Sequence, residues 1–218
     1  MNIGKRIGLS IAVGGAILLG LMYWYQWQAD PLRDVEVDGY MNRIEAQTQV
    51  PGGRHDLPAL RKFLSEDDGL PIYTVNLYKF HEVAGYPAGS GFSGSGEDAY
   101  DRFSSVMIKL LLARGSHPVF GSSWADQANG DWDRIVIVRY RSRRDLVDLF
   151  ATDEFAIASL HKWASIKKHD RMLVQALHIP GGEVFILLLA LIFSLVTFLF
   201  CSRFFRPKQD ADIGPKLV

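Results

Sequence analysis

The amide of Asn76 is the group in this sequence whose surroundings most suggest chemistry. It lies in the middle of Ile72–Phe80, a run of β-branched and aromatic residues that predicts a strand. Asparagine is disfavoured in the middle of a strand, so the position needs a reason. In a structural interpretation, which we favour, the amide is hydrogen-bonded to a neighbouring backbone group. In a functional interpretation, Asn76, Tyr78 and His161 line a pocket that accepts a small molecule.

The histidines and nucleophilic residues do not form a catalytic or metal-binding pattern. No H-x-x-x-H or Cys/His spacing of the kind that binds zinc is present, and two residues such as His161 and His169 rarely suffice to hold a metal. No serine, cysteine or paired-carboxylate arrangement predicts hydrolysis. We therefore expect no metal and no cofactor. The six histidines are His55, His81, His117, His161, His169 and His178.

The segment after this strand contains a literal G-x-G-x-x-G, from Gly89 to Gly94. A dinucleotide site requires that motif directly after the strand of a parallel βαβ unit. Here a longer Gly/Ser-rich loop, 85–96, lies between the strand and the next helix, and it lacks the Gly-Lys-Ser/Thr of a P-loop. We interpret the loop as a flexible lid over the sheet rather than as a nucleotide site.

Four arginines cluster where the segment 134–140 ends, and a solvated basic face is the ordinary explanation. The chain as a whole has zero net charge, and residues 7–202 hold 18 basic and 22 acidic residues. We expect no nucleic acid partner, because nucleic acid binding needs a clustered basic surface. The four arginines are Arg139, Arg141, Arg143 and Arg144.

Each end of the chain carries an apolar segment without charges, at 7–27 and at 184–201. A helix of that length spans roughly 30 Å, the thickness of a bilayer core, so each segment predicts a transmembrane helix. A cleaved signal peptide is the alternative for the first segment, but Tyr23–Trp27 lacks the small residues of a cleavage site. We expect a two-pass protein of the lipid bilayer.

Basic residues flank the two apolar segments on the side of the chain termini. Because such residues stay on the cytoplasmic side, we expect cytoplasmic termini and a middle domain outside the cytoplasm. The sequence has a bacterial character, so the expected location is the inner membrane with the middle domain in the periplasm. The flanking residues are Lys5 and Arg6 at one end, and Arg203, Arg206 and Lys208 at the other.

Small residues recur every four positions in the first apolar segment. Four residues advance a helix by about 40° beyond one turn, so they form one slowly winding stripe. Such a stripe lets another helix approach closely, and we interpret it as a packing face in the membrane. The residues are Gly4, Gly8, Ala12, Ala16 and Gly20.

Between the apolar segments we expect a helical juxtamembrane segment at 28–70 and a domain at 71–180. The domain should be α+β, because its pattern reads strand, helix, strand, strand, helix, strand, the order of a ferredoxin-like split βαβ unit. Strands are expected at 72–80, 117–124, 134–140 and 171–179, and helices at 97–113 and at 142–168 with a break near Thr152.

A four-stranded sheet with both helices on one face leaves an apolar face uncovered. Pairing with the sheet of a second copy would bury it, so we expect a homodimer. One apolar set should comprise Tyr73, Val75, Leu77, Val136 and Val138, although alternation alone does not decide which set faces the helices.

Three stretches of this domain resemble one bacterial family: Asp67–Phe80, the loop GSGFSGSGEDAYDRF, and WDRIVIVRYRSRRDLVDLFATDEF. The chain is similar there to the domain-of-unknown-function family thirteen-thirty, within the dimeric α+β barrel superfamily, over about residues 57–179. The resemblance implies a ferredoxin-like fold and a homodimer joined sheet to sheet, and it implies no established reaction. The two membrane helices depart from the usual small soluble member.

The resemblance also gives Asn76 a second meaning. Some members of the superfamily are haem-degrading or quinol-oxidising monooxygenases, and the haem-degrading type has an asparagine on the first strand with a histidine and a tryptophan nearby. His161 and Trp163 are candidates for that pair, but the likeness carries over residue by residue only to Asn76.

Two functions therefore remain open. The leading one is a membrane-tethered dimeric module that serves as an accessory or interaction subunit, with another membrane protein as a partner. The alternative is a monooxygenase or isomerase acting on a lipophilic substrate such as a quinol or haem. An enzyme should join Asn76, Tyr78 and His161 in one deep pocket, whereas an interaction module should have these groups packed or bonded away.

Overall fold

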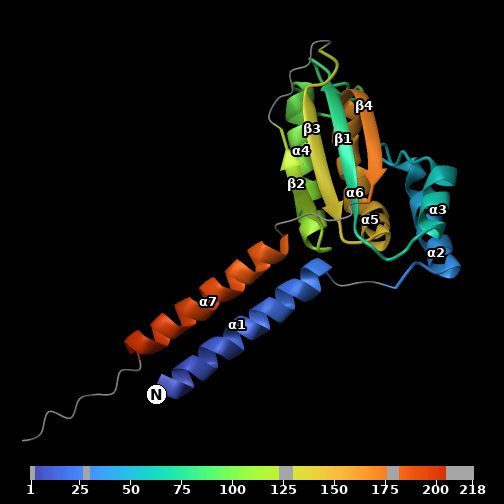
Figure 1. Ribbon diagram of the computed structural model, residues 1–218. Coiled ribbons are helices and arrows are strands. Elements are labelled where there is room, and N and C mark those ends of the chain that lie inside the picture. The colour runs from blue at the N-terminus through green and yellow to red at the C-terminus, as the bar shows by residue number, and fades with distance from the viewer. Residues whose placement is uncertain (1–2, 27–29, 123–129, 176–181, 205–218) are drawn as a thin grey trace, which may run out of the picture. The chain divides into compact units, whose positions relative to one another are not determined.

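The computed structural model describes residues 3–26, 30–122, 130–175 and 182–204 (Figure 1). The chain divides into two compact units. One comprises residues 1–24 with 178–218, and the other comprises residues 25–177.

The first unit contains two long helices, α1 (Ile3–Gln26) and α7 (Gly182–Phe204). Both are long and apolar enough to cross a membrane, with a mean hydropathy of 1.9 over Ile3–Tyr25 and 3.0 over Val184–Arg203. They run antiparallel, so the start of α1 and the end of α7 lie at the same end of this unit (Figure 1).

The two apolar helices meet at small residues. The Ser194 hydroxyl donates to the Ser10 carbonyl at 2.9 Å, which satisfies a polar group on an otherwise apolar helix. A Cβ on Gly14 would lie 2.9 Å from the Ser194 Cβ, so glycine is needed at this approach. The contact therefore uses a face of α1 that the four-residue spacing did not indicate.

The predicted small-residue stripe lies on the exposed side of α1, and it stays a prediction. A Cβ on Gly8 or Gly20 would meet nothing within 4 Å. The stripe is therefore open to a helix of another chain. Its members, all exposed, are Gly4, Gly8, Ala12, Ala16 and Gly20.

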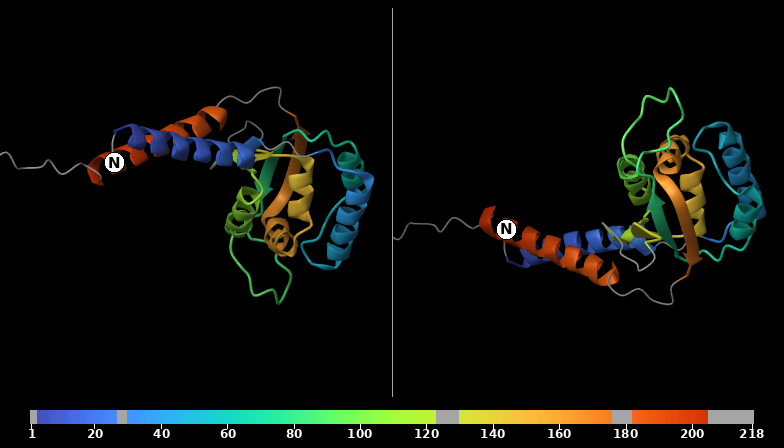
Figure 2. Two further views of the ribbon diagram at one scale, coloured as in Figure 1. Left: turned by 90° about the horizontal axis from the view of Figure 1, so that it is seen from below. Right: turned by 90° about the horizontal axis from the view of Figure 1, so that it is seen from above.

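The second unit is α+β, built on a four-stranded sheet in the order β2-β3-β1-β4 with every neighbouring pair antiparallel. Three helices, α4, α5 and α6, lie on one face of the sheet (Figures 1 and 2). The strands are β1 (Ile72–Phe80), β2 (His117–Gly121), β3 (Arg134–Tyr140) and β4 (Ile166–Val174). The helices of this layer are α4 (Gly96–Leu112), α5 (Arg143–Phe150) and α6 (Asp153–Ser165).

Most of these elements agree with the sequence patterns, because polar caps mark their ends. Ser95 caps α4 by accepting from the Asp98 amide, Ser142 caps α5, and Thr152 caps α6 at the predicted break. The predicted start of the last strand was wrong: β4 begins at Ile166 rather than at Arg171. Residues 123–124 of the expected second strand and 176–179 of the expected last strand lie outside the described part of the chain.

The two faces of the sheet follow from the strand register. The rings of Tyr78 and Phe80 pack at a tilt against Tyr100 of α4, so the even-numbered residues of β1 face the helices. Opposite neighbours share a face in an antiparallel pair, and Val136 and Val138 pair with Asn76 and Thr74. The expected set of five was therefore wrong in two members, since Val136 and Val138 face the helices.

The open face carries the odd-numbered residues of β1 and their neighbours. Phe120, Met172 and Val174 are 51%, 50% and 41% exposed. No helix of the described part of this unit covers this group, although Tyr25 covers one end of the face by stacking on Arg139 at 3.9 Å. We call the apolar group the open sheet face; it comprises Val75, Leu77, Phe120, Ile135, Ile137, Met172 and Val174.

Two further helices complete this unit, α2 (Asp34–Ala46) and α3 (Leu57–Ser65), with a 3₁₀ turn at Gln47–Gln49. Their apolar residues Val37, Ile44 and Leu64 belong to the same buried core as Leu146 and Leu149 of α5. The segment 28–70 thus contributes packed structure to the α+β unit.

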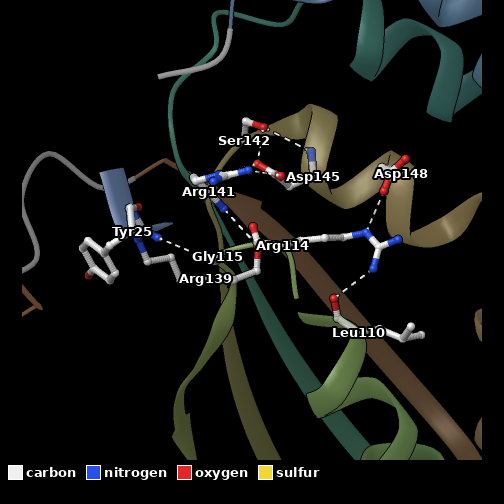
Figure 3. Close-up of polar contacts among 10 residues, drawn as sticks. Tyr25, Leu110, Arg114, Gly115, Arg139, Arg141, Ser142, Asp145 and Asp148 are labelled. Atoms are coloured by element: carbon white, nitrogen blue, oxygen red, sulfur yellow. Dashed lines mark hydrogen bonds and ion pairs between the residues drawn. The ribbon is translucent and has the colours of Figure 1, made fainter. Parts of the chain in front are cut away.

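The arginine cluster holds these parts together instead of forming a solvated face. Arg139 is 3% exposed and donates to the carbonyls of Tyr25 and Gly115, and Arg141 pairs with Asp145 at 2.7 Å (Figure 3). Arg144 pairs with Glu36 of α2 at 2.6 Å, which lowers the pKa of that carboxyl to about 2. Arg144, in the first turn of α5, thus has an acidic partner, which offsets its unfavourable position at the positive end of the helix dipole.

Candidate ligand-binding cavity

A cavity of about 380 Å³ lies within the second unit. Its walls come from the loop before α3, from α3 itself, and from α5, α6 and β4. One part is apolar and largely aromatic, made by Leu60, Phe63, Leu146, Phe150, Phe155, Trp163 and Leu173. The other part is polar and mostly basic, made by Arg54, His55, Asp56, Ser159, Lys162, His169 and Arg171.

Two glycines position the loop that forms the rim. A Cβ on Gly52 would collide with the carbonyl oxygen of Ala156 in α6, and one on Gly53 would collide with the carbonyl oxygen of Gln47. The Trp163 indole donates to the Gly52 carbonyl at 3.2 Å. The loop is therefore fastened directly to the helix that supplies Ser159 and Lys162.

The next residues set the direction of α3. The Asp56 carboxylate accepts from the Ala59 amide at 3.1 Å and so caps the helix. His55 packs at a tilt against Phe150 and Phe155, with its ring centroid 5.3 and 6.2 Å from theirs. The imidazole is thereby held between the basic and aromatic parts of the wall.

Burial and neighbouring positive charge lower the pKa values of Lys162, His55 and His169. Burial and the nearby charge of Arg171 lower the pKa of the Lys162 ammonium to about 7. Burial, with the charges of Lys162 and Arg171, lowers the pKa of His55 to about 4 and that of His169 to about 3. At neutral pH both histidines are therefore neutral, and Lys162 is close to half-protonated.

Asn76 lies on the covered face of the sheet, 5% exposed, with its amide fully engaged. Its nitrogen donates to the Thr74 hydroxyl at 3.0 Å and the Val136 carbonyl at 3.2 Å. Its oxygen lies 3.2 Å from Nε2 of His169, so the neutral imidazole carries its proton on that nitrogen. The structural interpretation of Asn76 accounts for every one of these contacts.

Tyr78 extends the same buried arrangement. It is 3% exposed and stacks on His169 with ring centroids 4.8 Å apart, and burial raises the pKa of its phenol. Asn76 and Tyr78 thus reach the cavity only through His169, which lines it.

His161 belongs to a different cluster, which fastens the Gly/Ser-rich loop to α6. Its Nδ1 lies 2.7 Å from the Tyr86 hydroxyl, which accepts from Arg102 at 3.2 Å and therefore donates to the imidazole. Phe92 of the same loop packs edge-on against the His161 ring at 4.7 Å. Among the described residues, none of Asn76, Tyr78 and His161 lines the cavity.

The sequence patterns did not indicate this cavity, because its polar residues come from distant segments that look ordinary one at a time. Nothing in the sequence distinguishes Lys162 and Arg171 from the ordinary charged residues of a helix and a strand, or Ser159 from an ordinary helix serine. His169 was considered only as a metal ligand, and no group of three or more metal-binding residues occurs in the described ranges.

Comparisons with known proteins find chains of similar fold and give no information on function. No protein-family model and no curated protein sequence matches the chain. Two solved crystal structures resemble it, both of the RPA0582 protein, one methylated and one described as a protein of unknown function from Rhodopseudomonas palustris. Each is 19% identical with a TM-score of 0.52; the matches cover 59% and 58% of this chain and 96% and 97% of those chains. The likeness shows an α+β sheet fold alone.

Proposed function

We propose that this chain is a two-pass bacterial inner-membrane protein whose α+β unit, in the periplasm, is a ferredoxin-like module that dimerises through its open sheet face. Its role is that of an accessory or interaction subunit of a membrane assembly. The observation that carries the proposal is the open sheet face, an apolar surface that runs across all four strands, with three members on the edge strands at least 41% exposed.

The strand order supports the ferredoxin-like part of the proposal. The sequence of elements β1-α4-β2-β3-α5/α6-β4, with spatial order β2-β3-β1-β4, agrees with the split βαβ arrangement. In that arrangement one face of the sheet packs on helices and the other is left for a second layer. A second copy supplies a layer of matching shape and composition, which agrees with the resemblance to the dimeric α+β barrel superfamily.

The first unit supports the membrane part of the proposal. Its two apolar helices run antiparallel, so Lys5 and Arg6 of α1 share one end with Arg203 of α7 (Figure 1). Basic residues at one end agree with cytoplasmic termini. Anchoring two copies in one bilayer raises their effective concentration and strengthens a weak sheet-to-sheet contact.

The monooxygenase or isomerase alternative has less support. Asn76 and Tyr78 are buried and bonded on the covered face, and His161 is bonded to the loop residue Tyr86. Groups that are already satisfied by the protein offer no free donor or acceptor to a substrate. The separation of these three residues therefore favours the interaction module.

The proposal is tested by co-expressing two differently tagged copies and extracting them in mild detergent. We expect each tag to retrieve the other copy, with Ile157→Asp, an exposed position on α6, as a control that keeps the association. Retrieval of one tag alone would contradict the homodimer. Protease added outside spheroplasts should cut within residues 30–175, and protection of that segment would contradict the orientation.

A further inference from the structure

The basic side chains that line the cavity outnumber its acidic ones, so the cavity carries a net positive charge. Within the described ranges no carboxylate forms an ion pair with Lys162 or Arg171, whereas Arg114, Arg134, Arg141 and Arg144 each pair with an aspartate or glutamate. The one acidic residue in the lining, Asp56, is occupied in capping α3. Lys162 is half-buried, and a half-buried cation without a counter-charge is costly unless an anion joins it; the exposed Arg171 adds positive charge to the same wall.

Two further polar groups in the same wall lack partners among the described residues. The Ser159 hydroxyl, on a residue 2% exposed, and Nε2 of His55 are both buried without a hydrogen bond. Buried polar atoms are nearly always satisfied in native proteins, so unsatisfied ones in a cavity lining mark the place of a missing partner. Both groups can donate a hydrogen bond to an oxygen of a ligand.

The apolar part of the wall limits what that anion can be. The aromatic rings of Phe63, Phe150 and Phe155 offer nothing to a bare phosphate or sulfate, but they can bury a hydrocarbon or aromatic group. A volume of about 380 Å³ lies at the small end of the roughly 300–1,000 Å³ usual for small-molecule sites. The ligand must therefore be small, with one anionic end and one apolar end.

We propose that this cavity binds a small amphipathic carboxylic acid, with its carboxylate at Lys162, Arg171 and Ser159 and its apolar group against Phe150 and Phe155. Lys162 also lies 5.2 Å from the Trp163 ring, which holds the ammonium at the junction of the two parts. The site is complete within one copy of the chain and lies on the covered side of the sheet. It is thus independent of the proposed sheet-to-sheet dimer.

The charged groups around Lys162 give the site a defined pH dependence. The loop before α3 contributes Arg54, His55 and Asp56, β4 contributes His169 and Arg171, and α5 contributes only apolar residues. Because the low pKa values of the two histidines keep them neutral down to about pH 4, Lys162 is the group that titrates near neutrality. A carboxylate favours protonated Lys162, so binding should be tighter at pH 6 than at pH 8, by up to about tenfold.

The test uses the full-length protein in mild detergent, with benzoate as the probe and isothermal titration calorimetry as the measurement. Benzamide has the same shape without the charge, and inorganic phosphate has charge without the apolar group. We expect benzoate to bind at least about tenfold more tightly than either, a difference of about 1.4 kcal/mol. At pH 8, benzoate binding should also take up protons, seen by comparing buffers of different ionisation enthalpy.

Variants separate the cavity from the rest of the surface. Lys162→Met should weaken benzoate binding about tenfold or more at pH 6 and abolish the pH dependence. The control is Lys167→Met, at an exposed position of β4 outside the cavity lining, which should bind benzoate as the wild type does. If Lys162→Met does not fold, Lys162→Arg should keep the affinity and lose the pH dependence. Equal binding of benzoate and benzamide, wild-type affinity in Lys162→Met, or no benzoate binding at about 10 mM would overturn the proposal. Benzoate binding should persist in a monomeric Ile137→Asp variant, so its loss and the loss of the dimer are distinguishable.

Discussion

The two faces of the sheet differ in how their residues are satisfied. On the covered face, the polar side chains of Thr74, Asn76 and His169 bond to one another, and Tyr78 stacks within the same layer. On the open face, Ile135 and Ile137 lie beside Leu77 and Val75, and no described helix of this unit packs over them (Figure 1). A polar residue in a strand is therefore no sign of activity when its partners are present, and an apolar face without a layer is the better sign of an interaction.

The largest expected difference comes from placing the same charge on neighbouring residues of β3. Val136→Asp puts a carboxylate on the covered face beside Asn76 and should prevent folding, a loss of about 4–5 kcal/mol or more. Ile137→Asp puts it on the open face and should leave the fold intact. Circular dichroism with urea unfolding in detergent compares the two, and a folded Val136→Asp variant would invert our assignment of the faces.

A smaller loss is expected from removing the amide on the covered face. Asn76→Leu keeps the size of the side chain but leaves the Nε2 proton of His169 without its acceptor. An unsatisfied buried donor costs about 1–3 kcal/mol, so the free energy of unfolding should fall by that amount. Val83→Leu, at a loop position 76% exposed, is the control and should change little. An Asn76→Leu protein as stable as the wild type would show that the amide is not structural.

We also expect the stability of the protein to depend on pH, because two histidines, His55 and His169, are partly buried on the covered side of the sheet. The pKa values of His55 and His169 are lowered to about 4 and about 3 in the folded protein, below the ordinary value of about 6.5. Between those values the unfolded chain binds more protons, so stability should be highest above pH 6.5 and fall progressively toward pH 3. Urea midpoints measured from pH 7.5 to pH 4 check this.

A matched variant assigns the effect. His169→Phe keeps an aromatic ring against Tyr78 without a titrating nitrogen. The stability of this variant should therefore fall less, as the pH is lowered from 7.5 to 4, than that of the wild type. The open face contributes no histidine among its seven members, and Ile157→Asp should keep the wild-type slope. A slope unchanged in His169→Phe would assign the pH dependence to other groups.

The smallest expected effect concerns the cavity cation. Lys162 is held near Arg171 without a carboxylate partner, so Lys162→Met removes a repulsion and should leave the free energy of unfolding unchanged or raise it by about 1 kcal/mol. Thermal unfolding of the two proteins at pH 6, where Lys162 is mostly protonated, makes the comparison. A marked loss of stability would mean that the ammonium has a structural role.

Much of the fold could be predicted from the sequence because local signals are strong there. The strands at Ile72–Phe80 and Arg134–Tyr140 are continuous runs of β-branched and aromatic residues, and Ser95, Ser142 and Thr152 are recognisable caps. The last strand begins with Ile166, Lys167 and Lys168, and this basic stretch resembles the end of an exposed helix. Only its pairing with β1 makes that segment a strand.

The cavity could not be predicted, because its chemistry depends on which distant groups lack partners. Arg141 and Lys162 look alike in the sequence, yet one meets Asp145 and the other meets only Arg171 and aromatic rings. In the same way, spacing identified a stripe of small residues on α1, but the contact with α7 forms at Ser10 and Gly14 on another face. The spacing of small residues identifies a helix face that can pack closely, but it does not identify which helix packs there.

The central claim is that the open sheet face joins two copies of the chain. Its most direct test is the protein mass of detergent-solubilised full-length protein at micromolar concentration, measured by light scattering with the detergent mass subtracted. We expect a dimer for the wild type and for Ile157→Asp, and a folded monomer for Ile137→Asp, because a charge at the centre of the paired faces would be buried without a partner. A wild type that is monomeric, or an Ile137→Asp variant that remains dimeric, would contradict the account.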